Sequence, residues 1–296
     1  MDLLPNRVLL TIFENCDFKD VLELRKVCRR FRNFIDDPEN LKFSPDAKFC
    51  GIDLTVNENQ KIDLSFHSEE DGSILMKNDS LDSAMRDLEK VLRFQQSKLT
   101  YFTLNINFPQ KSFTLVFSGS TNIKTESVRF LGCNQNQIMS FLSHLDPNYL
   151  RKVYTSSDFK LEMSKIVETI QWKSADELYW RPQEISVSLD HLGHFSRLKV
   201  CFKTLSATDL DFLKNIYTKS SKFLEFDAYS KEFSDFEHLE TLWGPPKIQS
   251  DGNCWFFKCS NRKNVLRIQC NFCELNFIKF FVFEKSDIPT GTVLLL

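Results

Sequence analysis

Hydrophobic residues recur at helical spacing through the first forty residues of the chain. One stripe holds four of them: Val8, Leu9, Ile12 and Phe13. A first helix is therefore predicted from Pro5, whose missing N–H costs nothing in a first turn. After the polar residues 15–19, a second stripe follows at helical spacing: Leu24, Val27, Cys28, Phe31 and Ile35. It predicts a second helix with Asp20 and Glu23 as its capping box and an end at residues 36–38.

Beyond Pro45 the pattern changes to short runs in which apolar and polar residues alternate, which is typical of strands. Five such runs lie in this part of the chain: 48–56, 61–66, 73–77, 99–108 and 112–117. Between the third and the fourth, the apolar residues of 81–96 predict a helix that Asp79 or Ser80 caps. Residues 46–118 are therefore expected to be a linking segment that is rich in strands and contains one helix.

From Glu126 onward, short strands alternate with helix-like stretches. The strand centres lie 20 to 26 residues apart: Val128, Val153, Leu178, Leu198 and Leu224. This spacing is close to the roughly 20 to 29 residues of a leucine-rich repeat, and it predicts a β/α solenoid with parallel strands over residues 119–250. A compact doubly wound α/β domain is the alternative that the same alternation permits.

Two apolar stripes predict helices between these strands: Ile138, Phe141, Leu142 and Leu145, then Met163, Ile166, Val167 and Ile170. A third helix is predicted after Ser206, which forms a capping box with Asp209. Residues 251–296 alternate again and predict a C-terminal antiparallel hairpin and a third strand that ends near Phe283. The fold class predicted for the whole chain is α/β (α+β overall), with a helical N-terminus and a leucine-rich-repeat-like β/α region.

The repeated strands also predict a binding face. If their central residues point inward, the residues beside them point outward: Lys152, Tyr154, Tyr179, Lys199 and Glu225. Tyrosine and long charged side chains on an exposed sheet face suit protein recognition, so these five residues are predicted to bind a target protein. Ordinary solvated strand residues are the alternative, and a slip of one residue would exchange the two faces.

The composition of the 296 residues, 42% hydrophobic and 26% charged, is that of a folded protein. The 8 glycines stand apart from one another, which excludes the common dinucleotide, P-loop and nucleophile-elbow motifs, whereas the 29 phenylalanines are expected to fill the core. A net charge of −2 argues against nucleic-acid and membrane partners. The chain has no apolar stretch of membrane-spanning length and no signal-peptide pattern, so reduced cysteines and a cytoplasmic or nuclear location are expected.

Candidate metal ligands and catalytic groups are few. Four cysteines have a spacing that superficially resembles a zinc site: Cys254, Cys259, Cys270 and Cys273. Aromatic, strand-like sequence surrounds them, and His191 and His194 lack the acidic residue of a metalloprotease motif, so no metal is predicted. No nucleophile with its base and no carboxylate pair is evident, so no cofactor, no catalytic residue and no intrinsic catalysis are expected. A metal-dependent enzyme that uses these cysteines is the weakest functional alternative.

Five basic residues lie close together near the end of the second predicted helix: Arg25, Lys26, Arg29, Arg30 and Arg32. Such a cluster could contact phosphates. The acidic residues around it favour a solvated helix face instead.

The N-terminal segment resembles an F-box over residues 1–42. The pattern that carries the resemblance is Leu4-Pro5, then Val8 and Ile12, then the run from Leu22 to Phe31 that reads Leu-x-Leu-Arg-Lys-Val-Cys-Arg-x-Phe. The resemblance implies docking onto a Skp-type adaptor that links the chain to cullin and RING subunits. The positions that would contact the adaptor are Leu4, Pro5, Val8, Ile12, Leu22, Leu24 and Val27. The alternative is that these residues form the core of an N-terminal helical cap.

The later part of the chain resembles the FTH domain that accompanies the F-box in a large nematode family. Five segments between residues 110 and 250 carry the resemblance: 124–130, 145–150, 171–175, 194–195 and 221–223. In that family this domain is taken to be the module that chooses the target. The resemblance therefore implies a substrate-recognition subunit of an SCF-type ubiquitin ligase, which is not itself an enzyme. An adaptor-bound scaffold of a protein or ribonucleoprotein complex, without ubiquitin transfer, is the alternative.

Overall fold

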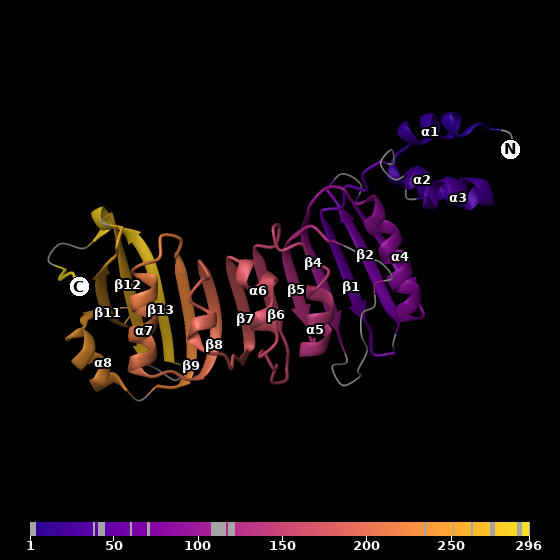
Figure 1. The fold of residues 1–296 in the computed structure, drawn as a ribbon. Coiled ribbons are helices and arrows are strands. Elements are labelled where there is room, and N and C mark those ends of the chain that lie inside the picture. Colours follow the sequence, from indigo (N-terminus) through magenta and orange to yellow (C-terminus); the bar gives the residue numbers. More distant parts are fainter. Residues whose placement is uncertain are drawn as a thin grey trace. The chain divides into compact units, whose positions relative to one another are not determined.

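A computed structural model describes residues 4–37, 39–40, 45–59, 61–69, 72–107, 117, 122–233, 235–250, 252–261, 263–272, 276–288 and 292–295. The chain divides into two compact units, and Figure 1 shows the helices and strands of both. The first contains Met1–Ser127 and Ser140–Tyr149, and the second contains Val128–Met139 and Leu150–Leu296.

The first unit begins with three helices, α1 (Asn6–Glu14), α2 (Phe18–Val27) and α3 (Arg29–Asp36). The sequence predicted one helix after residue 19, and this prediction was wrong: the helix begins earlier and is interrupted in its middle. The N-cap of α2 is Asp17, whose carboxylate accepts a hydrogen bond from the Asp20 N–H at 2.8 Å. Cys28 is extended, with φ −156° and ψ 165°, and it divides the predicted helix in two. The apolar stripe is therefore shared between two helices.

Phenylalanine rings hold these helices together and join them to the rest of the first unit. Phe13 of α1 stacks on Phe34 of α3, with ring centroids 5.3 Å apart. Phe18 of α2 packs instead against Phe49 and Phe94, at 5.6 and 5.4 Å, outside the three helices. The helical segment therefore packs against the rest of the first unit, as expected of a segment of about forty residues that is too small to stabilise its own core.

That sheet has the strand order β4-β1-β2-β3 within the first unit. Its elements are β1 (Gly51–Val56), β2 (Ile62–Ser68), β3 (Gly72–Asn78), α4 (Leu81–Phe94) and β4 (Leu99–Ile106). β1 runs parallel to β4, while β2 is antiparallel to both β1 and β3. Ser80 caps α4 by accepting a hydrogen bond from the Ser83 N–H, which confirms one of the two predicted caps. The strand predicted at 112–117 lies outside the described residues, except for Phe117.

β5 (Thr125–Leu131) and α5 (Gln135–Leu142) lie where the chain passes between the units. In the second unit four parallel strands follow in chain order, β6 (Lys152–Ser156), β7 (Glu177–Glu184), β8 (Arg197–Thr204) and β9 (Glu225–Glu232). One buried residue of each strand lies in register with the next: Val153, Leu178, Leu198 and Phe226. The predicted inward residue of the last strand was wrong, because Leu224 precedes β9 and is 45% exposed.

The connections between these strands differ in length and form. The stripe predicted from Met163 to Ile170 is not one helix but the 3-10 turn η2 (Ile166–Glu168) and the short helix α6 (Ile170–Ser174). Thr169 is extended and caps α6, and Ile170 is exposed. η3 (Leu189–His191) connects β7 to β8, and α7 (Ala207–Tyr217) connects β8 to β9. The capping box predicted at α7 is confirmed.

The chain closes with α8 (Phe236–Trp243), β10 (Lys247–Gln249), β11 (Gly252–Lys258), β12 (Asn264–Phe272), β13 (Asn276–Glu284) and η4 (Lys285–Asp287). These strands are antiparallel in the order β10-β11-β12-β13, and β13 pairs antiparallel with β9. Residues 292–295 run along β11, where Leu295 and Phe257 form a parallel bridge. The class is thus α/β, with a large mixed sheet.

Phenylalanine is the core filler that the composition predicts. Six examples are buried: Phe13, Phe31, Phe130, Phe202, Phe226 and Phe280. Tyr217 of α7 packs against Phe226 and Phe280, so α7 covers the face of the sheet that carries the buried row (Figure 1). Within the described ranges, no helix is long and apolar enough to cross a membrane.

Candidate functional site

The three N-terminal helices carry two sets of apolar side chains. The first set is buried between the helices or against the sheet: Leu9, Phe13, Phe18, Val21, Phe31, Phe34 and Ile35. The predicted adaptor contacts are absent from it. Leu4, Ile12, Leu22 and Leu24 are half-buried, Pro5 is exposed, and Val8 and Val27 are 40% and 56% exposed. The sequence reasoning therefore selected apolar residues that the helices leave partly open to solvent.

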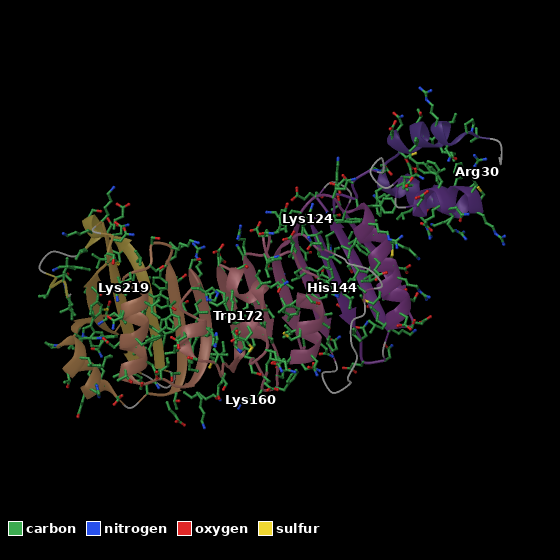
Figure 2. The ribbon with its side chains drawn as sticks, in the orientation of Figure 1. Arg30, Lys124, His144, Lys160, Trp172 and Lys219 are labelled. Carbon is green, nitrogen blue, oxygen red and sulfur yellow. The ribbon has the colours of Figure 1, made fainter. Side chains whose placement is uncertain are left out.

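The basic cluster of these helices is largely engaged within them. The Arg25 guanidinium donates two hydrogen bonds to the Asp36 carboxylate, at 2.8 and 2.7 Å, and these lower the pKa of Asp36. Lys26 pairs with Glu23, and the Arg30 side chain donates to the Leu4 carbonyl (Arg30 is labelled in Figure 2). These contacts support the interpretation of a solvated helix face.

The predicted target-binding residues come together on one face of the parallel strands. We call this surface the outer sheet face and define it by the outward side chains of β6, β7, β8, β9 and β13: Lys152, Tyr154, Glu177, Tyr179, Arg197, Lys199, Glu225, Asp227, Tyr229, Phe277, Lys279 and Phe281. It lies opposite the buried row, because successive residues of a strand point to opposite faces. All five predicted residues belong to it.

Two recessed carboxylates organise the outer sheet face. Glu177, with a side chain 10% exposed, lies 2.9 Å from Arg197 and 3.6 Å from Lys152, and it accepts a hydrogen bond from the Tyr179 hydroxyl at 3.1 Å. Burial and the charge of Glu177 raise the pKa of Tyr179. Asp227, 9% exposed at its side chain, lies 3.3 Å from Lys199 and 3.6 Å from Lys279.

Lys279 also binds Glu225, at 2.6 Å, and this hydrogen bond lowers the pKa of Glu225. The sequence reasoning missed four members of this network: Glu177, Arg197, Asp227 and Lys279. The first two could have been found, because each directly precedes a residue of the predicted inward row. Lys279 could not have been found, because β13 and β9 lie about fifty residues apart in the sequence. The pattern of apolar residues does not indicate that these two strands pair.

Two adjoining grooves lie in the second unit near the carboxyl ends of β7 and β8. The larger, of about 820 Å³, is lined by Phe202, Phe212 and Lys203 among others, and the smaller, of about 510 Å³, by Met163 and Val167. Lys160, labelled in Figure 2, borders both. Carboxyl ends of parallel strands are common places for ligands, but cations and carboxylates both line these grooves, which gives no preference for one sign of charge.

A polar chain on β1, β2 and β3 was not anticipated. The His67 ring lies 2.7 Å from the Asp53 carboxylate through Nε2 and 2.8 Å from the Ser73 hydroxyl through Nδ1. His67 and Ser73 are cross-strand partners, so the contact follows from the register of β2 and β3. The order of groups is that of a nucleophile, a base and an orienting acid, but none of the three lines either groove, and we assign them a cross-strand structural role.

The structure places the candidate metal ligands on several elements of the second unit. Cys254 and Cys270 are buried in the β11–β12 pair, and burial raises the pKa of the Cys270 thiol. Cys273 lies outside the described residues. The ring of His194 lies 3.0 Å from the Trp172 carbonyl, and the Trp172 indole donates to the His191 carbonyl. Across the part of the chain that the structure describes, no group of three or more His, Cys, Asp or Glu residues could hold a metal ion.

Comparison with known proteins finds two domains in the chain. Residues 1–43 match the F-box domain, and residues 110–243 match the FTH domain. The F-box A protein 224 of Caenorhabditis elegans is 24% identical over 150 residues, which are 50% of this chain and 39% of that relative. The chain therefore matches about two fifths of the relative's length. No solved structure shows a significant match.

Proposed function

From the premise that this chain is an F-box protein of the nematode type with an FTH domain, we propose that it is the substrate-recognition subunit of an SCF-type ubiquitin ligase. In this proposal the F-box binds a Skp-type adaptor with its cullin and RING subunits, and the FTH domain binds a target protein. The subunit contributes proximity and no reacting side chain. It holds the target beside the conjugating enzyme and so raises the effective concentration of the two.

The observation that carries the proposal is the second set of apolar side chains on α1 and α2. Val8 and Val27 are 40% and 56% exposed although the core of the helices is filled by other residues. Exposed apolar side chains that form a patch are typical of protein-binding surfaces. They suit the adaptor contacts that the F-box resemblance implies, namely Leu4, Pro5, Val8, Ile12, Leu22, Leu24 and Val27.

Copurification with a Skp-type adaptor tests the docking. The double variants Leu4→Ala with Pro5→Ala, and Val8→Asp with Val27→Asp, are expected to reduce the adaptor that is recovered by about tenfold or more, because they remove or charge apolar contact area. The matched control is Ile248→Asp, which changes an 82% exposed apolar residue of β10. Undiminished recovery with both double variants would reject the docking assignment.

Ubiquitin transfer is tested separately from docking. Proteins that bind to the full chain are identified first. Their half-lives are then compared between cells that contain the unaltered chain and cells that contain the variant Val8→Asp with Val27→Asp. A substrate receptor predicts a longer half-life with the variant. A scaffold that binds the same proteins predicts no change.

A further inference from the structure

The outer sheet face presents its charges at two depths. The carboxylates of Glu177 and Asp227 are 10% and 9% exposed, whereas the side chains of Lys152, Arg197, Lys199 and Lys279 are 29% to 43% exposed. The Glu225 carboxylate, 27% exposed, lies at about the same depth as its partner Lys279. Each recessed carboxylate lies between two of these cations. Above Glu177 and Asp227, an approaching partner therefore meets ammonium and guanidinium groups first, and these two carboxylates hold those groups in place.

Aromatic rings lie between the cations. Tyr154 is 37% exposed, and its ring centroid is 6.4 Å from that of Tyr179, whose hydroxyl is held by Glu177. Tyr229 and Phe277 pack at 5.1 Å on the neighbouring strands. Such fixed rings offer apolar contact area at a low cost in conformational entropy.

The outer sheet face has a boundary on the side of β11 and β12. There Cys254, Phe256 and Val265 form a buried cluster, and Phe283, Ile288 and Leu294 pack against it. The outward side of these two strands is therefore covered by the chain itself, whereas the side chains of β6, β8 and β13 on the outer sheet face remain half-exposed or exposed. The accessible area is the part that carries the cations and tyrosines.

We propose that the outer sheet face binds an acidic segment of the target protein. Carboxylates of the segment pair with Arg197, Lys199 and Lys152, and an apolar or aromatic side chain of the segment packs against Tyr154 and Tyr179. This inference rests on the proposed function and names the chemistry of its target. A charge of −2 for the whole chain gives no long-range attraction to anions, so recognition depends on these fixed cations.

The arrangement favours an acidic polypeptide over a nucleic acid. Binding to a phosphate backbone depends on many cations whose counterions are released. On the outer sheet face each cation already has a carboxylate as its counterion, at 2.6 to 3.6 Å. An acidic segment of the target adds a few carboxylates beside these ion pairs and leaves the existing pairs in place.

Fluorescence anisotropy with the full chain tests the proposal. The probe is a fluorescein-labelled peptide of about twelve residues in which Glu and Tyr alternate, a length that spans several strands. The comparison probes are the same peptide with Lys in place of Glu and an oligouridylate of equal length. We expect the acidic peptide to bind, the basic peptide not to bind, and Arg197→Gln with Lys199→Gln to weaken the binding by about tenfold or more.

The matched control is Lys219→Gln with Lys222→Gln, which removes the same charge from the exposed turn after α7 (Lys219 is labelled in Figure 2). Tyr154→Ala is the second test variant, because this exposed ring is less critical to folding than the ion pairs. It should weaken the acidic peptide about threefold or more. Circular dichroism establishes that each variant is folded.

Three results would overturn the proposal. The acidic peptide does not bind, or its affinity falls equally in the control and in both test variants. In the third, the oligouridylate binds more tightly than the acidic peptide, and Arg197→Gln with Lys199→Gln abolishes that binding. The last result would assign the face to single-stranded nucleic acid. None of these measurements involves the adaptor, so failure here leaves the docking assignment to its own test.

Discussion

A tyrosine hydroxyl stabilises or destabilises the fold of this chain according to whether it has a hydrogen-bond partner. The Tyr179 hydroxyl donates to a recessed carboxylate. The Tyr217 hydroxyl is buried in a ring cluster, with the Phe223 centroid 3.8 Å from its own, and it has no hydrogen-bond partner among the described residues. Burial raises its pKa, so it stays neutral. A buried polar group without a partner costs about 1 to 3 kcal/mol.

Removing the two hydroxyl groups should therefore change stability in opposite directions. Tyr217→Phe is expected to raise the free energy of unfolding by about 1 kcal/mol, and Tyr179→Phe to lower it by about 1 kcal/mol. Urea unfolding followed by circular dichroism measures both, and each variant is a control for the other because the ring is retained. A loss of stability in Tyr217→Phe would mean that its hydroxyl has a partner.

At the scale of elements, periodicity predicted where helices and strands occur but not where helices divide. The stripes across Cys28 and Thr169 look continuous, yet both residues are extended and each starts a new helix. Cys28 makes no side-chain cap bond, so no local signal in the sequence marks that division. Thr169 accepts a hydrogen bond from the Trp172 N–H, a local cap that the continuous apolar stripe obscured. Ser80 and Ser206 were predictable as caps because capping is a local hydrogen bond.

The box at Ser206 gives an element-scale prediction. The Ser206 hydroxyl accepts from the Asp209 N–H at 3.1 Å, and the Asp209 carboxylate accepts from the Ser206 N–H at 2.9 Å. Ser206→Ala should lower the thermal midpoint, with a loss of about 1 kcal/mol of stability. Ser221→Ala, an exposed serine after α7, is the control and should be neutral. Equal effects of the two substitutions would argue against a contribution of the cap.

At the scale of the whole molecule, phenylalanines connect parts that the sequence pattern treats as separate. The pattern predicted the helical N-terminus and the strand-rich segment, but the contact of Phe18 with Phe49 and Phe94 joins them in one unit. Likewise, the outer sheet face was predicted on β6 to β9 alone, and β13 completes it from the far end of the chain. Contacts between distant segments are what a single sequence reports least.

Phe18→Ala should loosen the N-terminal helices from the rest of the first unit. The cavity and the lost apolar contact are expected to lower the unfolding free energy by about 3 kcal/mol. Amide hydrogen exchange in α1, α2 and α3 should accelerate, because this ring joins the helices to Phe49 and to Phe94 of α4. Phe212→Ala, at an exposed ring of α7, serves as the control with a change below about 1 kcal/mol. Unchanged exchange in the three helices would refute the role of Phe18.

The segment at residues 292–295 has a consequence for behaviour at high concentration. An open strand edge is a template on which a second molecule can add a strand and start an aggregate. Here the Leu295 N–H donates to the Phe256 carbonyl at 2.8 Å, and the Lys258 N–H donates to the Leu295 carbonyl at 3.1 Å. These bonds occupy backbone groups of β11 that could otherwise pair with a strand of a second molecule. The segment therefore opposes edge-to-edge association at this part of β11.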